Sequence, residues 1–206
     1  MRIETVMIDA DDGPRVQADL CRVETPIGAV VLTHPHPLYG GNRFNPIIDT
    51  LFRLLPAAGF DTVRFDFRGV GASTGDHDEG NGERLDVLAA IDLLGPEQID
   101  ATVWLVGYSF GSIVSLNVVD PRVRGWIAIA PPLAASGPCA AHDDPRPKLL
   151  MCPQRDQFSP PETVVPMVAG WADTELRVIA SADHFLGGAV PSIAADVVAH
   201  LTQRRR

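Results

Sequence analysis

Cysteine is scarce in this chain, and the few cysteines present follow no regular spacing. Cys21, Cys139 and Cys152 are the only three among 206 residues. An odd number without paired spacing argues against a disulfide framework, and it matches no common zinc-binding pattern. We therefore expect reduced, mostly buried thiols in a cytoplasmic protein.

Basic residues are also few. The 17 lysine and arginine residues stand against 26 aspartate and glutamate residues, which gives a formal net charge of −9. A chain without a basic stripe cannot neutralise many phosphates, so we expect neither a nucleic acid nor an anionic membrane as its partner. The basic run at residues 204–206 is expected to be a solvated tail.

Long hydrophobic runs are missing as well. The N-terminal segment MRIETVMIDADDG alternates apolar with charged residues, unlike the apolar part of a signal peptide. No apolar run approaches the roughly 18 residues that a membrane-spanning helix needs. We expect no association with a membrane.

The chain does contain a regular alternation of short Val/Ile/Leu runs and longer segments of helical periodicity. The first two runs alternate apolar and polar residues, as strands with one wet face do. The later runs are continuous and typical of parallel strands buried on both faces. This order predicts an α/β class and a single domain over residues 1–206, with a mostly parallel central sheet, helices on both faces and an antiparallel N-terminal pair. The expected strands are 3–8, 16–23, 29–33, 62–66, 103–108, 125–130, 149–152 and 176–180, and the expected helices are 46–58, 83–94, 109–119, 161–171 and 191–201.

One short segment joins a predicted strand to a predicted helix and places a serine at the junction. Gly107-Tyr108-Ser109-Phe110-Gly111 fits the pattern G-x-S-x-G in the structural context that this pattern requires. So sharp a turn strains its central residue, and larger side chains two positions away would collide with backbone. The alternative is a glycine-rich packing turn whose serine only caps the helix. The flanking strand and helix favour an exposed nucleophile.

A serine hydroxyl becomes a good nucleophile only when a base removes its proton, and the base needs an acid to orient it. After a turn of this kind the acid and the histidine are expected in that order along the chain. Asp156 is the only carboxylate in the loop that follows the seventh predicted strand, and His184 lies in the loop after the eighth. The alternative acids are Asp143, Asp144 and Asp183.

With these three residues in place, the chain resembles the α/β-hydrolase superfamily, specifically the small, lid-less, dienelactone-hydrolase-like hydrolases of bacteria. Residues 33–42 (THPHPLYGGN) are similar to the HPHP…GG loop of that group, and residues 65–75 (FDFRGVGASTG) to its arginine–glycine loop. The resemblance extends over residues 29–190, nearly the whole chain.

The resemblance implies an α/β-hydrolase fold in which Ser109, Asp156 and His184 act as nucleophile, acid and base. It implies no cap domain, because only residues 131–147 lie at the usual insertion point and they are too few for an independent helical lid. Dienelactone hydrolase itself uses a cysteine nucleophile, so the serine argues against dienelactone as the substrate.

Acyl transfer also needs two backbone N–H groups directed at the developing oxyanion. Phe110, the residue after the nucleophile, is expected to supply one. His36 is expected to supply the other, because the neighbouring Pro35 and Pro37 have no N–H to donate. The apolar loop residues expected to line an open, shallow substrate site are Leu38, Tyr39, Phe158 and Phe185.

These features predict a serine hydrolase that cleaves small carboxylic esters, or thioesters, through an acyl-enzyme, with no cofactor and no metal. The expected partner is a small-molecule ester, and assembly into a homodimer is left open. Two other interpretations remain. His34 and His36 form an H-x-H pair that could hold the metal ion of a metal-dependent hydrolase. The same scaffold could also serve a non-catalytic interaction protein.

Overall fold

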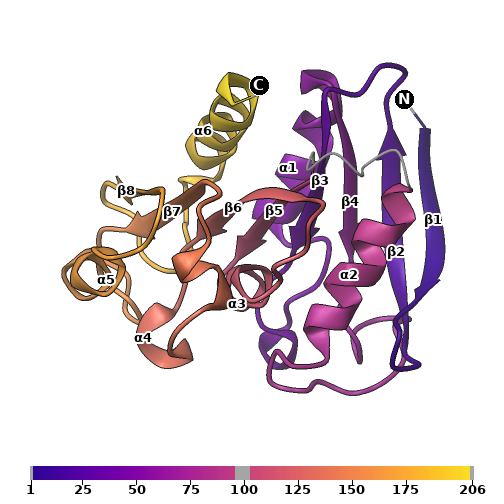
Figure 1. The fold of residues 1–206 in the computed structure, drawn as a ribbon, viewed down its shortest axis with the longest axis horizontal. Coiled ribbons are helices and arrows are strands. Elements are labelled where there is room, and N and C mark those ends of the chain that lie inside the picture. The colour runs from indigo at the N-terminus through magenta and orange to yellow at the C-terminus, as the bar shows by residue number, and fades with distance from the viewer. Residues whose placement is uncertain (1, 96–102, 205–206) are drawn as a thin grey trace.

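The computed structural model describes residues 2–95 and 103–204, and these form one twisted eight-stranded sheet (Figure 1). The strand order is β1-β2-β4-β3-β5-β6-β7-β8. β2 runs antiparallel to both of its neighbours, and the pairings from β4 to β8 are parallel. The sequence-based prediction of a mostly parallel sheet with an antiparallel N-terminal pair is therefore confirmed. The strands are β1 (Arg2–Asp9), β2 (Arg15–Arg22), β3 (Gly28–Thr33), β4 (Phe60–Phe65), β5 (Val103–Tyr108), β6 (Val123–Ile129), β7 (Lys148–Pro153) and β8 (Thr174–Ile179).

Helices cover both faces of the sheet, and each face has its own hydrophobic core. On one face α1 and α6 pack over side chains such as Val30, Val106 and Ile127. On the other face α2, α3 and α5 pack over Val31, Leu105 and their neighbours. Alternate residues of each buried strand therefore serve opposite cores, which explains the continuous Val/Ile/Leu runs. The helices are α1 (Pro46–Leu54), α2 (Glu83–Leu94), α3 (Phe110–Leu116), α4 (Leu133–Ser136), α5 (Pro161–Val168) and α6 (Val190–Gln203), with short 3₁₀ helices η1 (Pro37–Tyr39), η2 (Pro56–Ala58) and η4 (Ala140–Asp143).

Two strands differ from their sequence-based description. The polar face of β2 is not wet: Asp19 is 4% exposed, because the guanidinium groups of Arg43 and Arg64 cover it and donate hydrogen bonds to its carboxylate. β8 is not buried on both faces. Its residues are largely half-exposed, because it lies at the edge of the sheet that the described residues form, next to β7.

The connection from β6 to β7 is short, and it contains only α4 and η4. The predicted absence of a cap domain at this position is confirmed, since four-residue elements cannot form a separate lid. The three cysteines are buried and unpaired, as their spacing predicts. None of the helices in the described ranges is long and apolar enough to cross a membrane.

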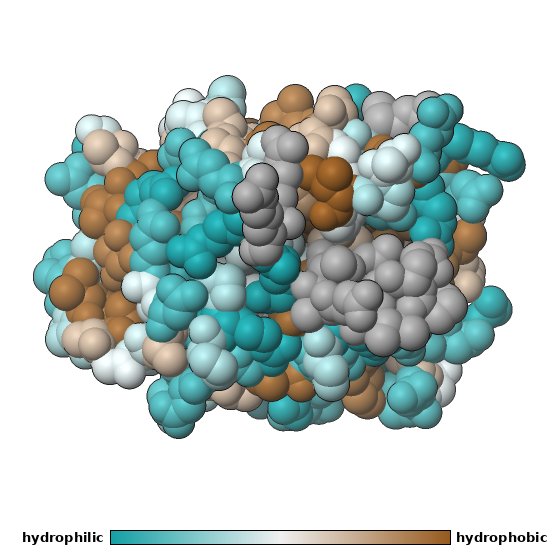
Figure 2. Space-filling model, turned by 45° about the horizontal axis from the view of Figure 1, so that its top comes forward, coloured by the Kyte–Doolittle hydropathy of each residue, from teal (hydrophilic) through white to brown (hydrophobic). Residues whose placement is uncertain are grey.

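The strand directions place the predicted site residues and the chain termini at opposite edges of the sheet. The carboxyl ends of β3 to β8 meet at one edge of the sheet, where the loops bearing the predicted site residues begin. β1 starts at the opposite edge, and α6 returns to it, so the N- and C-terminal ends of the described chain share that side (Figure 1). Residues 205 and 206 of the basic run lie outside the described residues. Viewed from near this end, hydrophobic side chains occur in small separate groups among hydrophilic ones (Figure 2).

Candidate active site

The turn between β5 and α3 holds its serine in the geometry that the motif predicts. Ser109 has φ 53° and ψ −121°, a region that non-glycine residues rarely occupy. Its own N–H donates to the carbonyl of Ile129 on the neighbouring strand (2.9 Å), which fixes the turn against the sheet. A Cβ on Gly111 would lie 2.5 Å from the carbonyl oxygens of Thr33 and His34. Gly111 therefore lets α3 begin directly against the end of β3.

The structure brings the three predicted residues into one chain of hydrogen bonds. Nδ1 of His184 donates to Oδ2 of Asp156 (2.8 Å), so Nε2 of the neutral ring is free to accept. The hydroxyl of Ser109 lies 2.9 Å from that nitrogen. The side chains of His184 and Asp156 are only 7% and 1% exposed. A serine proton can thus pass to a histidine whose orientation a buried carboxylate sets.

Asp156 is held as a carboxylate by more than the histidine. Its Oδ1 accepts the N–H groups of Phe158 (2.8 Å) and Ser159 (3.0 Å). Burial alone would raise the pKa of Asp156, but the hydrogen bonds from His184, Ser159 and Phe158 lower it below its ordinary value. The Asp156 carboxyl group is therefore ionised at neutral pH.

The alternative acids make other contacts. Asp183 accepts the N–H of Phe185 (3.1 Å) in a local turn. Asp144 pairs with Arg146 (2.7 Å), and Asp143 lies 2.9 Å from His142. Each of these carboxylates is thus used next to its own position in the chain, and Asp156 is the one hydrogen-bonded to His184.

Two side chains that the sequence analysis missed position the backbone of His184. The hydroxyl of Tyr108 donates to the His184 carbonyl (2.9 Å), and the amide oxygen of Gln157 accepts the His184 N–H (3.1 Å). Burial raises the pKa of Tyr108 to about 12, so this hydroxyl keeps its proton. Both residues adjoin predicted site residues in sequence, which is the only sequence signal that could have identified them.

The two predicted oxyanion donors lie beside each other. The ring of His36 packs 4.8 Å from the ring of Phe110, centroid to centroid. Among the described residues no acceptor is hydrogen-bonded to the backbone N–H of either one. An unpaired backbone N–H can donate a hydrogen bond to a developing oxyanion, and Phe110 directly follows the candidate nucleophile in the chain.

His34 is buried, and both of its ring nitrogens are hydrogen-bonded to backbone. Nδ1 donates to the Pro35 carbonyl (2.6 Å), and Nε2 accepts the Phe67 N–H (3.0 Å). His36 uses its Nδ1 to accept the Leu38 N–H (3.3 Å). No group of three or more His, Cys, Asp or Glu residues within 2–95 and 103–204 is arranged to hold a metal ion. Both ring nitrogens of His34 and Nδ1 of His36 are therefore hydrogen-bonded to backbone groups, whereas a metal ligand needs a ring nitrogen that is free to coordinate.

His77 is a further residue that sequence reasoning did not place near the site. Its ring lies 4.8 Å from that of His36 and 5.3 Å from that of Phe110. Nδ1 of His77 lies 2.7 Å from the fully buried carboxylate of Glu83, which also accepts the N–H groups of Asp78 and Gly80. His77 reaches His36 through the course of the long loop between β4 and α2. No local sequence motif predicts the course of that loop.

The predicted pocket residues are exposed on loops that follow β3, β7 and β8 at the carboxyl edge of the sheet, and we refer to them together as the apolar rim. Leu38 and Tyr39 are 71% and 87% exposed on η1, and Phe158 and Phe185 are 55% and 69% exposed on the loops after β7 and β8. The ring of Phe158 lies 4.6 Å from that of His184.

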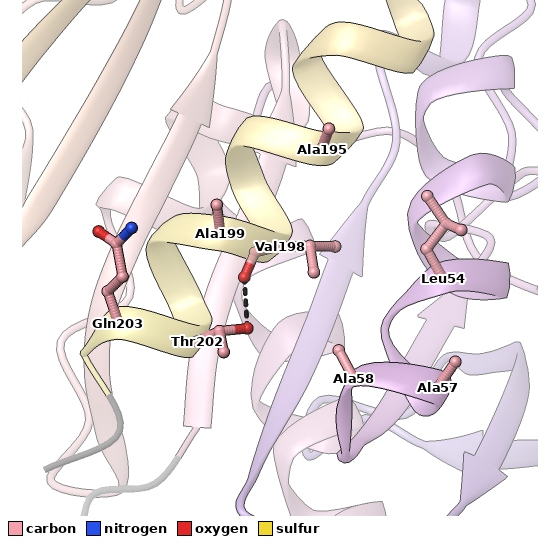
Figure 3. A pocket seen from close by; sticks show the side chains of 8 residues that line it. All are labelled: Leu54, Ala57, Ala58, Ala195, Val198, Ala199, Thr202 and Gln203. Carbon is pink, nitrogen blue, oxygen red and sulfur yellow. Dashed lines mark hydrogen bonds between the residues drawn. The ribbon is translucent and has the colours of Figure 1, made fainter.

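A separate groove of about 540 Å³ lies between α6 and the α1–η2 segment (Figure 3), and none of its lining residues is a predicted site residue.

Buried ion pairs connect the loop after β3 to the sheet. Arg43 donates to Asp19 through Nε (3.2 Å) and to Asp66 through its backbone N–H (2.7 Å) and Nη1. Arg64 donates to the same oxygen of Asp19 (3.0 Å) and to Asp49 (2.6 Å). The arginine of the predicted arginine–glycine loop, Arg68, instead pairs with Asp86 and Asp12, both at 2.7 Å, and is structural.

Residues 30–204 match the sequence profile described as the alpha/beta hydrolase family. The match covers most of the chain, which therefore belongs to this family. The chain is also similar to an alpha-beta serine hydrolase homologue from Coxiella burnetii, at 31% identity, 98% coverage of both chains and a TM-score of 0.86. A lid-less a/b serine hydrolase from Xanthomonas campestris is 25% identical, with 99% of this chain and 95% of that chain covered and a TM-score of 0.80.

A further relative matches over a shorter segment. An uncharacterized protein of Rickettsia prowazekii is 35% identical over 128 residues, which is 59% of this chain and 54% of that protein. The aligned segment thus spans about half the length of the curated relative. The superfamily, the fold and the lid-less architecture that the sequence predicts are confirmed by these comparisons.

Proposed function

We propose that this protein is a serine hydrolase that cleaves small carboxylic esters through an acyl-enzyme intermediate. The observation that carries the proposal is the continuous path from the Ser109 hydroxyl to His184 Nε2 (2.9 Å) and from His184 Nδ1 to the Asp156 carboxylate (2.8 Å). This path begins at the β5–α3 turn of a chain that belongs to a hydrolase family. The turn lies at the carboxyl edge of the sheet, where ligands of such folds bind.

The reaction follows from these contacts. As Ser109 Oγ attacks the ester carbonyl, its proton moves to His184 Nε2, and Asp156 stabilises the imidazolium that forms. The carbonyl oxygen becomes an oxyanion, for which the N–H groups of His36 and Phe110 are the proposed donors. When the tetrahedral intermediate collapses, the alcohol leaves with the proton from His184. A water molecule, deprotonated by the same histidine, then attacks the acyl-enzyme, and the acid leaves with Ser109 regenerated.

The exposed apolar rim supports small esters as the substrate class. Leu38, Tyr39, Phe158 and Phe185 offer apolar contact on an open surface, and the short β6–β7 connection provides no lid to enclose a long chain. An open rim buries only part of an acyl group, so lengthening the chain adds little binding free energy beyond the rim. We infer a preference for short acyl groups on oxygen or sulfur.

The two alternative functions lack a supporting observation. A metal-dependent hydrolase would need nitrogens that His34 uses for Pro35 and Phe67. A non-catalytic interaction protein would have no need of a strained serine at φ 53° aligned with a histidine and a buried carboxylate, because such strain is costly unless it serves a function.

A serine-directed fluorophosphonate probe tests the proposal directly. We expect covalent labelling at Ser109, located by mass spectrometry, and hydrolysis of p-nitrophenyl esters that is fastest for acetate and butyrate. Labelling at another serine, or no ester turnover at all, would contradict the proposal. Activity that prolonged chelation abolishes and zinc restores would favour the metal-dependent alternative.

We further propose that the protein acts on a free small molecule in the cytoplasm, as a single domain and without a cofactor, nucleic acid or membrane. The three buried, unpaired thiols support a reducing compartment. Homodimer formation stays open as a prediction, and light scattering coupled to size-exclusion chromatography would test it by measuring the mass in solution.

A further inference from the structure

The carbonyl oxygen of Pro35 is held on two sides. His34 Nδ1 donates to it at 2.6 Å, and it packs so closely on Gly41 that a Cβ there would overlap it. The same imidazole accepts the backbone N–H of Phe67 through Nε2 at 3.0 Å. A carbonyl can only accept and a backbone N–H can only donate, so the two contacts define a neutral ring with its proton on Nδ1. We call this pair of hydrogen bonds the His34 link.

The His34 link acts on the peptide group that carries the proposed oxyanion donor. The Pro35 carbonyl and the His36 N–H belong to one planar, trans peptide, in which the two bonds point in opposite directions. Whatever fixes the direction of the Pro35 oxygen therefore fixes the direction of the His36 N–H. That N–H donates to no protein acceptor in the described ranges, so no hydrogen bond of its own holds it.

The far end of the link is itself anchored to the sheet. Phe67 lies two residues after β4, and its neighbour Asp66 donates its N–H to the Gln17 carbonyl on β2 (2.9 Å). The Asp66 carboxylate also accepts the backbone N–H of Arg43 (2.7 Å) at the other end of the loop. The loop from His34 to Arg43 is thus tied to residues 66 and 67 at both ends.

We propose that His34 is a positioning residue that aligns the His36 N–H with the oxyanion of the reaction, by holding the Pro35 carbonyl from the opposite side of the same peptide. The proposal rests on the proposed function for its effect on rate, whereas the hydrogen bonds themselves do not depend on it. His34 is 0% exposed and cannot touch a substrate, so it acts only through this peptide. Burial lowers the pKa of His34 to about 4, which keeps the link intact at neutral pH.

Two amide substitutions separate the two halves of the link. In His34→Asn the side-chain NH₂ group lies near the position of Nδ1 and still donates to Pro35, whereas the contact to Phe67 is lost. In His34→Gln the side-chain oxygen reaches the position of Nε2 and still accepts from Phe67, whereas the contact to Pro35 is lost. Each variant loses one buried hydrogen bond, so we expect similar decreases in Tm.

The rates should nevertheless differ. We expect His34→Asn to keep kcat on p-nitrophenyl acetate within about threefold of wild type, because the donor to Pro35 remains. His34→Gln should lose about 10-fold to 100-fold in kcat with little change in KM, less than the roughly 10²–10³-fold of a deleted oxyanion donor. Affinity for a trifluoromethyl ketone, whose serine adduct carries an oxyanion, should fall in parallel with kcat/KM in the Gln variant only.

Equal losses of kcat in the two variants, in step with their Tm values, would overturn the proposal and leave His34 a purely structural residue. Side-chain ¹⁵N NMR of the wild-type protein provides a check that needs no activity, with His34 expected as the Nδ1–H form at pH 7. The Nε2–H form would overturn the proposal by itself. If the wild type hydrolyses no ester, the proposed function fails and the NMR result alone decides the His34 link.

Discussion

At the scale of single residues, the roles proposed for Ser109, His184 and Asp156 depend on one another. The serine hydroxyl is 2.9 Å from the histidine, and the histidine is 2.8 Å from the aspartate. A hydroxyl that loses its base, or a base that loses its partner, falls back to the weak reactivity of an ordinary serine. The effects of substitutions in this group should therefore be far from additive.

Ser109→Ala and His184→Ala should each lower kcat by about 10⁴-fold or more, and the double variant should be little worse than either single one. The fold should be retained in Ser109→Ala, because the hydroxyl's hydrogen bond within the described residues is the one to His184. Steady-state kinetics on p-nitrophenyl acetate, with circular dichroism as the control, measures both. Multiplicative losses in the double variant would mean that the two residues act independently.

Asp156→Asn should lose roughly 10⁴-fold in kcat, because the amide can present its NH₂ group to Nδ1 and favour the wrong tautomer of His184. Asp183→Asn is the matched control, since Asp183 adjoins the same histidine but its carboxylate, within the described part of the chain, accepts only the Phe185 N–H. It should stay within about threefold of wild type. A greater effect at position 183 than at 156 would transfer the role of the acid.

Substitutions at His36 separate backbone from side chain. His36 has φ −55°, within the range that proline adopts, so His36→Pro removes the N–H with little change of the local chain. We expect a loss of about 10²–10³-fold in kcat for His36→Pro and less than about tenfold for His36→Ala, measured on the same ester. Comparable losses in the two variants would assign the role to the imidazole and reject the backbone donor.

At the scale of elements, the site depends on how closely α3 begins against β3. The Thr33 hydroxyl donates to the Gly111 carbonyl (2.9 Å), and the space above Gly111 is filled by the carbonyls of Thr33 and His34. The carbonyls that pack against Gly111 at the start of α3 belong to Thr33 and His34, which lie at the start of the loop carrying His36. The candidate nucleophile and the proposed oxyanion loop are therefore parts of one packed junction.

Gly111→Ala should destabilise the protein by about 1–3 kcal/mol, because its methyl group must displace backbone rather than a flexible side chain. Gly170→Ala is the control, because a Cβ at Gly170 meets nothing within 4 Å. It should stay within about 0.5 kcal/mol of wild type. Urea denaturation measures both, and equal stabilities for the two variants would contradict the close packing at this junction.

The elements were predictable to the extent that their packing is local or periodic. The Gly107–Gly111 motif, the loop acid and the final histidine follow from residue type and order alone. The burial of Asp19 does not, because it depends on Arg43 and Arg64, which lie 24 and 45 positions away in the chain. The contact between His77 and His36 and the position of β8 at the edge of the sheet also depend on the course of the chain. Sequence periodicity does not predict that course.

At the scale of the whole molecule, burying a histidine makes folding depend on pH. His34 has a folded pKa of about 4, against an ordinary value of 6.5. Between these values the unfolded chain binds a proton that the folded chain does not, so stability is fully present above pH 6.5 and falls as the pH drops toward 4. A shift of this size corresponds to on the order of 3 kcal/mol.

The variant His34→Asn has no titrating group at this position. We expect its free energy of unfolding to fall less steeply than that of wild type between pH 6.5 and 4.5, as measured by urea denaturation at several pH values. Carboxylates such as Asp156, whose pKa is lowered, add their own loss below this window in both proteins. Parallel stability curves for the two proteins would show that His34 is not buried in its neutral form.

The two ends of the described chain, Arg2 at the start of β1 and Arg204 beyond α6, lie at the amino edge of the parallel strands. Ser109 opens at the other edge, across the full length of the sheet. A tether at either end would leave the apolar rim facing the solution, so attachment to a bead or an electrode at that end of the molecule should keep the proposed site open.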